Sequence, residues 1–440
     1  MSATLTLCLF SAALLLCVAL GKSTLYALLF GYVLFFLYGL LQHKSALQLL
    51  RCSLRSVKSI WKLLVTFLLI GVVTGVWRAS GTIAYLIYHA ANLLSPSILL
   101  PCAFLLCCLL SFLTGTSFGT AATMGVICMT MARAMGVSPM LAGGAMLSGC
   151  FFGDRCSPMS TSALLVCQVT GSDLHRNLRR MLRTGLVPFV LAFCIYALLG
   201  VLFPGTGGAA LQLQQVFAAH YRLSAWTLLP ALLVLLLSLL RCNVQLALLA
   251  STAAALLVGC FVQGLGMGQL LSVMVSGFHP QDASLAALMQ GGGVFSMGNV
   301  ALIVCVSSSY DGLFRETGLL GGLQGVIARL RTRMSRFGVM TITAIVTSVI
   351  GCNQTLAIML TQQLCHPEDA DASEYAVDLE DTAVVIAPLV PWSIAGATPL
   401  ATAGAPTGAL LFACYLYLLP LCGVIRNRKK KPAAAKRAAK

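Results

Sequence analysis

The segment GAMLSGCFFGDRCSPMSTSALLV, residues 144–166, interrupts an apolar stretch with a charged pair, a proline and a run of hydroxyl-bearing residues. In hydrocarbon, backbone that is not helical survives only where it lines a cavity or is buried in protein. We therefore expect a broken or re-entrant helix here, with Asp154 at the break. An ionisable group in the membrane is unfavourable unless it is paired, solvated or neutralised, which makes Asp154 a candidate functional residue.

The rest of the composition is that of an all-α polytopic membrane protein. Of the 440 residues, 59% are hydrophobic and 9% are charged, and a soluble domain could not bury so much apolar surface. Runs long enough to cross a bilayer as helices lie at 3–21, 24–42, 63–79, 185–203, 226–240, 244–264, 297–314 and 404–423. The stretches 98–131 and 140–172 are apolar but interrupted, and together they should produce one net crossing.

The net charge of +16 is gathered in loops, so it indicates membrane orientation and not a nucleic-acid partner. The basic clusters are Lys44, Arg51, Arg55, Lys58 and Lys62; Arg176, Arg179, Arg180 and Arg183; Arg329, Arg331, Arg333 and Arg336; and Arg426 to Lys440. Basic loops stay in the cytoplasm. We expect a multi-pass protein of the cell inner membrane with both termini cytoplasmic, and with 82–97, 204–225 and 267–291 outside.

An internal repeat organises the chain. The sequence GVWRASG at 75–81 recurs as GLFRETG at 312–318, and the pairs Gly115/Gly351 and Pro158/Pro391 keep nearly the same shift. Equivalent loops differ in charge, because the basic cluster at 329–336 corresponds to an uncharged stretch. We therefore predict two inverted-topology repeats of about five spans each, which is typical of transporters that hold a substrate near the midplane. The predicted boundaries are 1–203, an external connector at 204–225, 226–425, and a basic cytoplasmic tail at 426–440.

Polar, glycine-rich interruptions occur twice in each predicted repeat. They are Thr114–Thr120, Gly149–Thr161, Gly351–Thr355 and Glu380–Ser393. We expect re-entrant or broken helices at the midplane there, because freed carbonyls and hydroxyls can hold a cation and backbone amides an anion.

Carboxylates are the scarcest polar groups, since the chain has twelve Asp and Glu in all. Those that could lie in or beside the membrane are Asp154, Asp311, Glu316, Glu380 and Asp381. A structural pair with Arg155 or a helix cap is the alternative for Asp154. An interfacial cluster explains Asp311 and Glu316 equally well. Glu380 and Asp381 could cap the helix that follows.

The sequence resembles the NhaC-type Na+/H+ antiporter family, within the wider ion-transporter superfamily. The motifs that carry the resemblance are GTSFGT (115–120), SGCFFGDRCSP (148–158), GCN (351–353) and EDTAVVIAPLVPW (380–392), with weaker GVWRASGT and SMGNVALIVCVSSSYDGL segments. They cover residues 60–420 in order. The resemblance implies crossing helices around broken ones and secondary transport driven by an ion gradient, without a covalent cofactor. It points to Thr116, Ser117, Asp154, Ser157, Pro158, Asn353, Asp381, Pro391 and Trp392.

The chain departs from the family pattern after the Ser-Pro pair. The family continues with S-D-T-T-N, whereas here Ser160 is followed by Thr161, Ser162, Ala163 and Leu164, so an acidic position is absent. The polar stretch after GCN is shortened to Gln354 and Thr355. A site with fewer carboxylates could bind a cation less tightly or serve an uncharged or anionic organic solute.

These features favour an antiporter that exchanges cytoplasmic Na+ for external H+, with Asp154 binding the cation or a proton in turn. In low dielectric, a carboxylate is stable only when one of the two neutralises it. The candidate binding residues are Asp154, Thr116, Ser117, Ser157, Asn353, Gln354, Thr355 and Asp381. The candidate helix-break residues are Gly115, Gly153, Pro158, Gly351, Pro391 and Trp392. Na+ at Asp154 is the only metal expected.

Two other functions are compatible with the sequence. A Na+- or H+-coupled transporter of a small organic acid or amino acid would hold a carboxylate on the amides of GTSFGT and GCNQT. An intramembrane enzyme is disfavoured, because no Ser/His or Cys/His pair falls within the breaks. No cofactor is expected. The expected partners are a small ion or solute, the lipid bilayer and, optionally, a second copy of the chain as a homodimer.

Overall fold

The computed structural model describes residues 3–20, 23–93, 95–205, 209–240, 242–319, 327, 329–330, 334–366 and 371–427. Every regular element in these ranges is a helix, and the only β-type pairing is a single bridge between Phe278 and Gly291. Six helices in the described residues are long and apolar enough to cross a bilayer. They are α2 (Thr24–Leu41), α4 (Trp61–Ala79), η1 with α6 (Pro96–Ile98, Leu99–Thr114), α11 (Leu174–Leu202), α14 (Val244–Phe261), and η4 with α17 (Val294–Met297, Gly298–Thr317). The predicted all-α polytopic membrane fold is confirmed.

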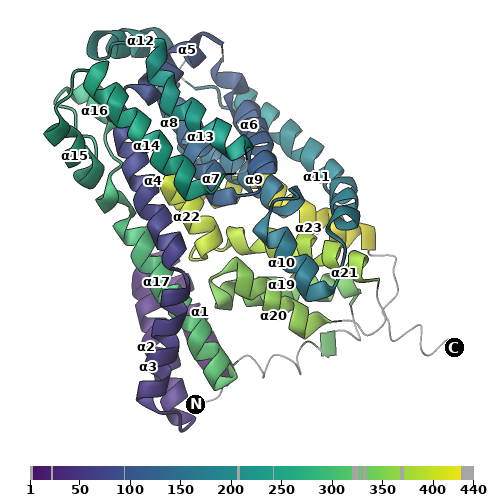
Figure 1. Cartoon of the computed structure of the whole chain (residues 1–440). Helices are drawn as coiled ribbons and strands as arrows, with labels where there is room; N and C mark the ends of the chain where they lie inside the picture. Colours follow the sequence, from purple (N-terminus) through teal and green to yellow (C-terminus); the bar gives the residue numbers. More distant parts are fainter. Residues whose placement is uncertain are drawn as a thin grey trace.

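The molecule is elongated, and its parts separate along its length (Figure 1). At one end, α1 (Ala3–Ala19), α2, α3 (Ala46–Ser59) and α17 pack together. Phe10, Phe35, Tyr310 and Phe314 form an aromatic core in this bundle, with ring centroids 4.9 to 5.9 Å apart. Edge-to-face aromatic pairs of this kind add to the apolar burial that holds the bundle together.

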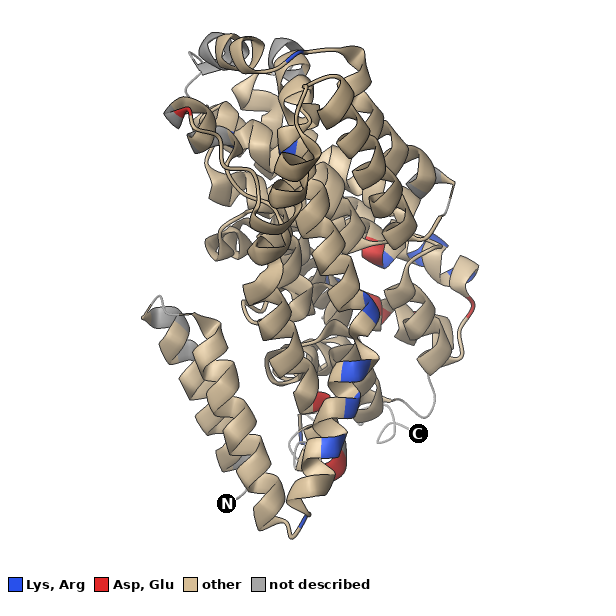
Figure 2. Cartoon of the chain, turned by 60° about the vertical axis from the view of Figure 1, so that its left-hand side comes forward, with Lys and Arg blue, Asp and Glu red and all other residues tan. Residues whose placement is uncertain are grey.

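The opposite end holds the three segments predicted to lie outside. The helices there are α5 (Thr82–Leu93), α12 (Ala209–His220), α15 (Met267–Ser276) and α16 (Ala283–Met289). Helix α12 packs against both α5 and α16. Figure 2 shows that most Lys and Arg residues lie on the part of the molecule away from this end. This charge separation fits the predicted sidedness, although which end faces the cytoplasm stays a prediction.

The interrupted helices lie between these two ends, and one of them, α8 (Val126–Ala134), reaches the end that holds α5 and α12 (Figure 1). In the first half they are α7 (Ser117–Thr120), α8, α9 (Pro139–Cys156) and α10 (Thr161–Thr170). In the second half they are α19 (Arg336–Gly351), α20 (Gln354–Cys365), α21 (Ala372–Leu379), α22 (Ile394–Ala403) and α23 (Cys414–Asn427). The segments Ala372–Leu389 and Ile394–Ala403 form a bent pair with an angle of 55°.

Small residues let α9 approach α6 closely. A Cβ atom on Gly153 would collide with the backbone of Ser111, and one on Gly149 would lie 2.5 Å from Cys107 Cβ. The Ser111 hydroxyl donates a hydrogen bond to the Cys150 carbonyl. Close helix packing through small residues and polar side chains is typical of membrane interiors. It fixes the last turn of α9, which carries Asp154, deep in the protein.

One predicted span is wrong. The apolar run 404–423 is not a single helix, because α22 ends at Ala403, a 3-10 turn covers Thr407–Phe412, and α23 begins at Cys414. Gly404 adopts a φ of 72°, and Pro406 follows it. A left-handed glycine and a nearby proline end a helix. The hydropathy of the run does not report this, because it depends on side-chain polarity and not on backbone conformation. The other uninterrupted spans are each covered by one helix, with a 3-10 start in two cases.

The two predicted repeats share local structure at their landmarks. Helix α6 ends at a left-handed residue, Gly115 with φ 67°, and α19 ends at Cys352 with φ 53°. The left-handed residue is thus Cys352, and Gly351 is the last residue of the helix. Ser160 and Ser393 both cap the next helix by accepting a backbone N–H. The opposite insertion of the halves and their boundaries stay predictions, and most of the basic tail lies outside the described residues.

Candidate functional site

Asp154 lies in the last turn of α9, where the helix breaks. The Ser157 N–H donates to the Gly153 carbonyl at 2.8 Å, and the chain then turns through Pro158. Ser157 Oγ accepts from the Met159 N–H at 3.2 Å, so this side chain shapes the turn. Ser160 Oγ accepts the N–H groups of Ser162 and Ala163 and starts α10. The predicted break in 149–161 is confirmed, and it leaves Asp154 only 4% exposed.

The hydrogen-bond partners of the Asp154 carboxylate are neutral groups. Oδ2 accepts from Ser162 Oγ at 3.1 Å and from Gln354 Nε2 at 3.0 Å. Ser160 Oγ lies 3.4 Å from Oδ1 and also donates to the Asp154 carbonyl. Hydroxyl groups can rotate to present lone pairs instead of protons. The same cage can therefore surround either a protonated carboxyl group or a carboxylate with a small cation.

Gln354 connects the two halves of the chain at this point. It is the first residue of α20, after the break at Cys352, and its Nε2 also donates to the Val384 carbonyl at 2.9 Å. Its Oε1 lies 3.2 Å from Ser162 Oγ. The structure brings Gln354 to Asp154 but not its neighbours. The Asn353 side chain caps α20 by accepting the Thr355 N–H at 2.9 Å, and Thr355 is exposed.

Glu380 is a buried carboxylate that is not among the binding residues predicted from the sequence. It begins a wide helical turn, Glu380–Val384, directly after α21, and it is 0% exposed. Neither of its carboxylate oxygens has a hydrogen-bond partner among the described residues, and its charged neighbours are Arg155, Asp154 and Asp381. A buried carboxylate without partners is strongly unfavourable when charged. This residue is therefore as unusual as Asp154, and the pair Glu380–Asp381 inside an apolar run was the signal for it.

Asp381 has a different environment from Asp154. Its Oδ1 accepts from Arg155 Nε at 3.0 Å and from Arg155 Nη2, and Arg155 is 0% exposed. Thr184 Oγ1 donates to the same oxygen at 3.3 Å, and Arg426 lies 3.5 Å from Oδ2. The alternative of an Asp154–Arg155 pair is wrong, because successive residues of a helix point about 100° apart. Arg155 pairs with Asp381.

Two further candidates, Thr116 and Ser117, lie at the first break and make no hydrogen bond to Asp154 within the described residues. Thr116 precedes α7, and its buried Oγ1 has no hydrogen-bond partner among the described residues. Ser117 is 3% exposed. A Cβ atom on Gly115 would lie 2.5 Å from the backbone of Met159, so the two breaks of the first half touch. No hydrogen bond joins Thr116 or Ser117 to the Asp154 cage in the described part of the chain.

The two breaks of the second half touch in the corresponding way. The Ile394 N–H donates to the Cys352 carbonyl at 2.9 Å. Trp392, which follows Pro391 in the turn, donates from Nε1 to the Val349 carbonyl at 2.9 Å. Trp392 therefore joins one break to the other by a hydrogen bond.

Comparison with known proteins matches this architecture to a family. A model of the Na+/H+ antiporter family matches residues 1–179 and 149–425. The Na+/H+ antiporter NhaC of Bacillus subtilis is 28% identical over 386 residues, which is 84% of each chain. The protein of the same name from Alkalihalophilus pseudofirmus is 26% identical over 367 residues, 81% of this chain and 79% of that one. The malate-2H+/Na+-lactate antiporter of B. subtilis is 25% identical over 343 residues, 74% of this chain and 71% of that one.

The relatives are antiporters by name, and each aligns over more than two thirds of both chains. The resemblance read from the motifs around Asp154 and Asn353 is confirmed by a family match that spans almost the whole chain. This chain belongs to the Na+/H+ antiporter family.

Proposed function

We propose that this chain is a secondary active Na+/H+ antiporter in which Asp154 binds Na+ and a proton in turn. The observation that carries the proposal is a carboxylate, 4% exposed, whose hydrogen-bond partners are all neutral and lie at a helix break. Family membership supports the same activity. A buried carboxylate without a resident counter-charge is stable only when an incoming cation neutralises it. Na+ and H+ therefore compete for one group, which is the requirement for exchange.

Glu380 takes part as a second carboxylate of the same site. It has no hydrogen-bond partner among the described residues, and it lies within electrostatic range of Asp154. Two neighbouring buried carboxylates strongly oppose being charged together, so a cation at one favours the loss of a proton from the other. Gln354 joins Asp154 to the backbone of the Glu380–Val384 turn and can transmit movement between them.

The transport cycle follows from the two interrupted halves. The chain lies in the cell membrane with both termini in the cytoplasm, and its halves are inserted in opposite directions. The site opens alternately to each side, taking Na+ from the cytoplasm and H+ from outside, as expected for inverted repeats. The chain performs no covalent chemistry, and its substrates are small ions.

A second candidate is transport of a small organic acid coupled to Na+ or H+. Two observations favour it. Thr116 Oγ1 is buried without a partner among the described residues, at the start of a polar break. One relative is named as an antiporter of malate and lactate. Flux of labelled malate or lactate in vesicles separates this activity from cation exchange.

The test of the main proposal uses everted membrane vesicles that contain the protein. Addition of Na+ should dissipate a preformed pH gradient, and Asp154→Asn should reduce the rate at least about 100-fold, because an amide cannot accept the exchanged proton. The matched control is Asp282→Asn, since Asp282 is an exposed residue in the loop before α16. Full activity of Asp154→Asn at normal protein abundance would refute the assignment.

A further inference from the structure

Helix α3 has one face against the protein and another face that is exposed in the described part of the chain. Its main packing partner is α17, where Gly312 allows close approach of the Cys52 carbonyl, and its buried Leu49 lies against Gly39 of α2. The residues Leu47, Leu50 and Leu54 are 55%, 44% and 60% exposed. Their spacing of three and four residues places them in one stripe along the helix. The spacing of Arg51, Arg55 and Lys58 places a basic stripe directly beside it.

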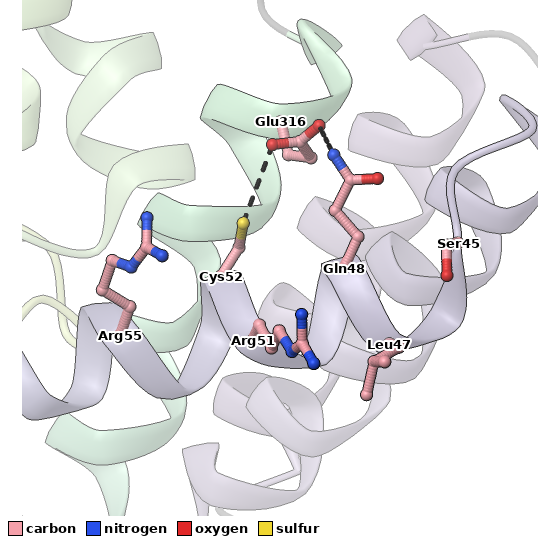
Figure 3. A pocket seen from close by; sticks show the side chains of 7 residues that line it. All are labelled: Ser45, Leu47, Gln48, Arg51, Cys52, Arg55 and Glu316. Atoms are coloured by element: carbon pink, nitrogen blue, oxygen red, sulfur yellow. Dashed lines mark hydrogen bonds between the residues drawn. The ribbon is translucent and has the colours of Figure 1, made fainter.

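A pocket of about 480 Å³ lies between α3 and the end of α17 (Figure 3). Arg51 and Arg55 line it together with Glu316. The Glu316 carboxylate is already bound, by Gln48 Nε2 at 2.7 Å, Lys44 Nζ at 3.1 Å and Cys52 Sγ at 3.7 Å. Arg51 and Arg55 make no hydrogen bond or ion pair within the described residues. Lys44 thus pairs with the one acid of the pocket, and the two guanidinium groups of the pocket have no acidic partner within the described residues.

We propose that α3 is a docking site for an anionic phospholipid, whose phosphate is held by Arg51 and Arg55 and whose acyl chains lie along Leu47, Leu50 and Leu54. Guanidinium groups bind phosphate through paired, charge-assisted hydrogen bonds. A free phosphate ion would contact only the arginines. A phospholipid would contact the arginines with its phosphate and the leucines with its acyl chains.

The position of α3 in the chain supports this occupant. The pocket is lined by Ser45 and Gln48, which follow the end of the spanning helix α2 at Leu41, and by Glu316 in the last turn of the spanning helix α17. Spanning helices end at the depth of the lipid headgroups. From the pocket, α3 runs beside α2 and α17 toward α4 (Figure 1), so the leucine stripe leads from the headgroup level toward the acyl chains.

The test measures binding of phosphatidylglycerol to the full purified chain, by native mass spectrometry and by thermal stability in phosphatidylcholine nanodiscs with increasing phosphatidylglycerol. Arg51→Gln/Arg55→Gln should need about 30-fold more phosphatidylglycerol for half of its effect, from two lost surface cations. The matched control is Arg179→Gln/Arg183→Gln on α11, which removes the same charge at two exposed residues. The control should keep the preference of the unmodified protein.

Three outcomes would overturn the proposal. The Arg51/Arg55 variant could keep its preference for phosphatidylglycerol, which would place the lipid elsewhere. The control pair could lose as much, which would show general charge attraction. Inorganic phosphate at matched concentration could stabilise the protein as well as the lipid does, which would identify a free anion as the occupant. Because the readout is lipid binding, failure here would leave the proposed exchange activity untouched.

Discussion

Asp154 and Asp381 are equally removed from solvent, with 4% and 1% exposed, yet the chain surrounds them differently. Asp381 accepts hydrogen bonds from the guanidinium of Arg155 and the hydroxyl of Thr184, so its negative charge is paired with a positive charge of the protein itself. Asp154 is held by two serines and an amide, which carry no charge. A resident cation fixes a carboxylate in place, whereas neutral groups leave room for a cation that comes and goes. Under the proposed function, Asp381 is a structural acid and Asp154 is the one that binds the transported ion.

The largest effect is expected when Arg155, the cation paired with Asp381, is removed. Arg155→Met leaves Asp381 buried without its main partner, and we expect it to destabilise the protein by about 3–5 kcal/mol. The double variant Arg155→Met/Asp381→Leu removes both charges and should recover most of that loss. Thermal unfolding in detergent measures both. Arg179→Met, at an exposed residue of α11, is the control.

If Arg155→Met unfolds at the same temperature as the unmodified protein, the ion pair is not structural. The distinction between the two aspartates would then have no energetic basis.

Glu380 resembles Asp154 in having no ion pair in the described residues, so its replacement tests the role of an unpaired buried acid. Because neither carboxylate oxygen of Glu380 has a hydrogen-bond partner among the described residues, Glu380→Gln removes a buried charge without breaking a hydrogen bond, and it should leave the unfolding temperature unchanged or higher. Exchange should fall at least about tenfold, a change of about 1.4 kcal/mol. Vesicle assays across a pH series measure this, with Glu374→Gln, a half-exposed acid on α21, as the control. A variant with normal exchange and a lowered unfolding temperature would make Glu380 structural instead.

The difference between these acids shows what sequence could and could not predict. The break at Asp154 was predictable, because a lipid-facing helix does not tolerate a charged pair and a proline in the middle of its apolar run. The partner of Arg155 was not, because Asp381 lies 226 residues away in the chain. Gln354 was found from the equivalent break of the second half, while its neighbours Asn353 and Thr355 face elsewhere.

Glu380 and the run 404–423 show how local patterns mislead. Glu380 follows a polar loop, which is the usual place of a helix cap, but α21 begins at Ala372 and carries it inward. The run 404–423 is apolar throughout, yet Gly404 and Pro406 end one helix before the next begins. Hydropathy measures affinity for lipid and is insensitive to the backbone geometry that divides a span.

Gln354 offers a smaller and more specific test. Gln354→Ala removes one hydrogen bond to Asp154 and one to the Val384 carbonyl. We expect Na+ to bind about two- to tenfold more weakly, as the loss of one hydrogen bond implies, with the maximal exchange rate less affected. Gln362→Ala is the control, because Gln362 lies on the same helix and donates to the Val169 carbonyl. An equal loss of Na+ affinity in both variants would attribute the effect to helix α20 as a whole.

The smallest effect is expected at an exposed ion pair, the solvent-facing counterpart of Arg155–Asp381. A hydrogen bond from Arg180 and the nearby Arg176 hold the pKa of Asp371, at the exposed start of α21, below its ordinary value. A carboxylate whose pKa is lower in the folded state stabilises the fold above its unfolded pKa of about 4 and loses that contribution as the pH falls through the folded value. The unfolding temperature of Asp371→Asn should therefore lie slightly below that of the unmodified protein at pH 7. The two should converge below about pH 4, and added salt should narrow the gap because exposed charges are screened. Because asparagine caps a helix about as well as aspartate, a gap that persisted at low pH and high salt would contradict the ion-pair explanation.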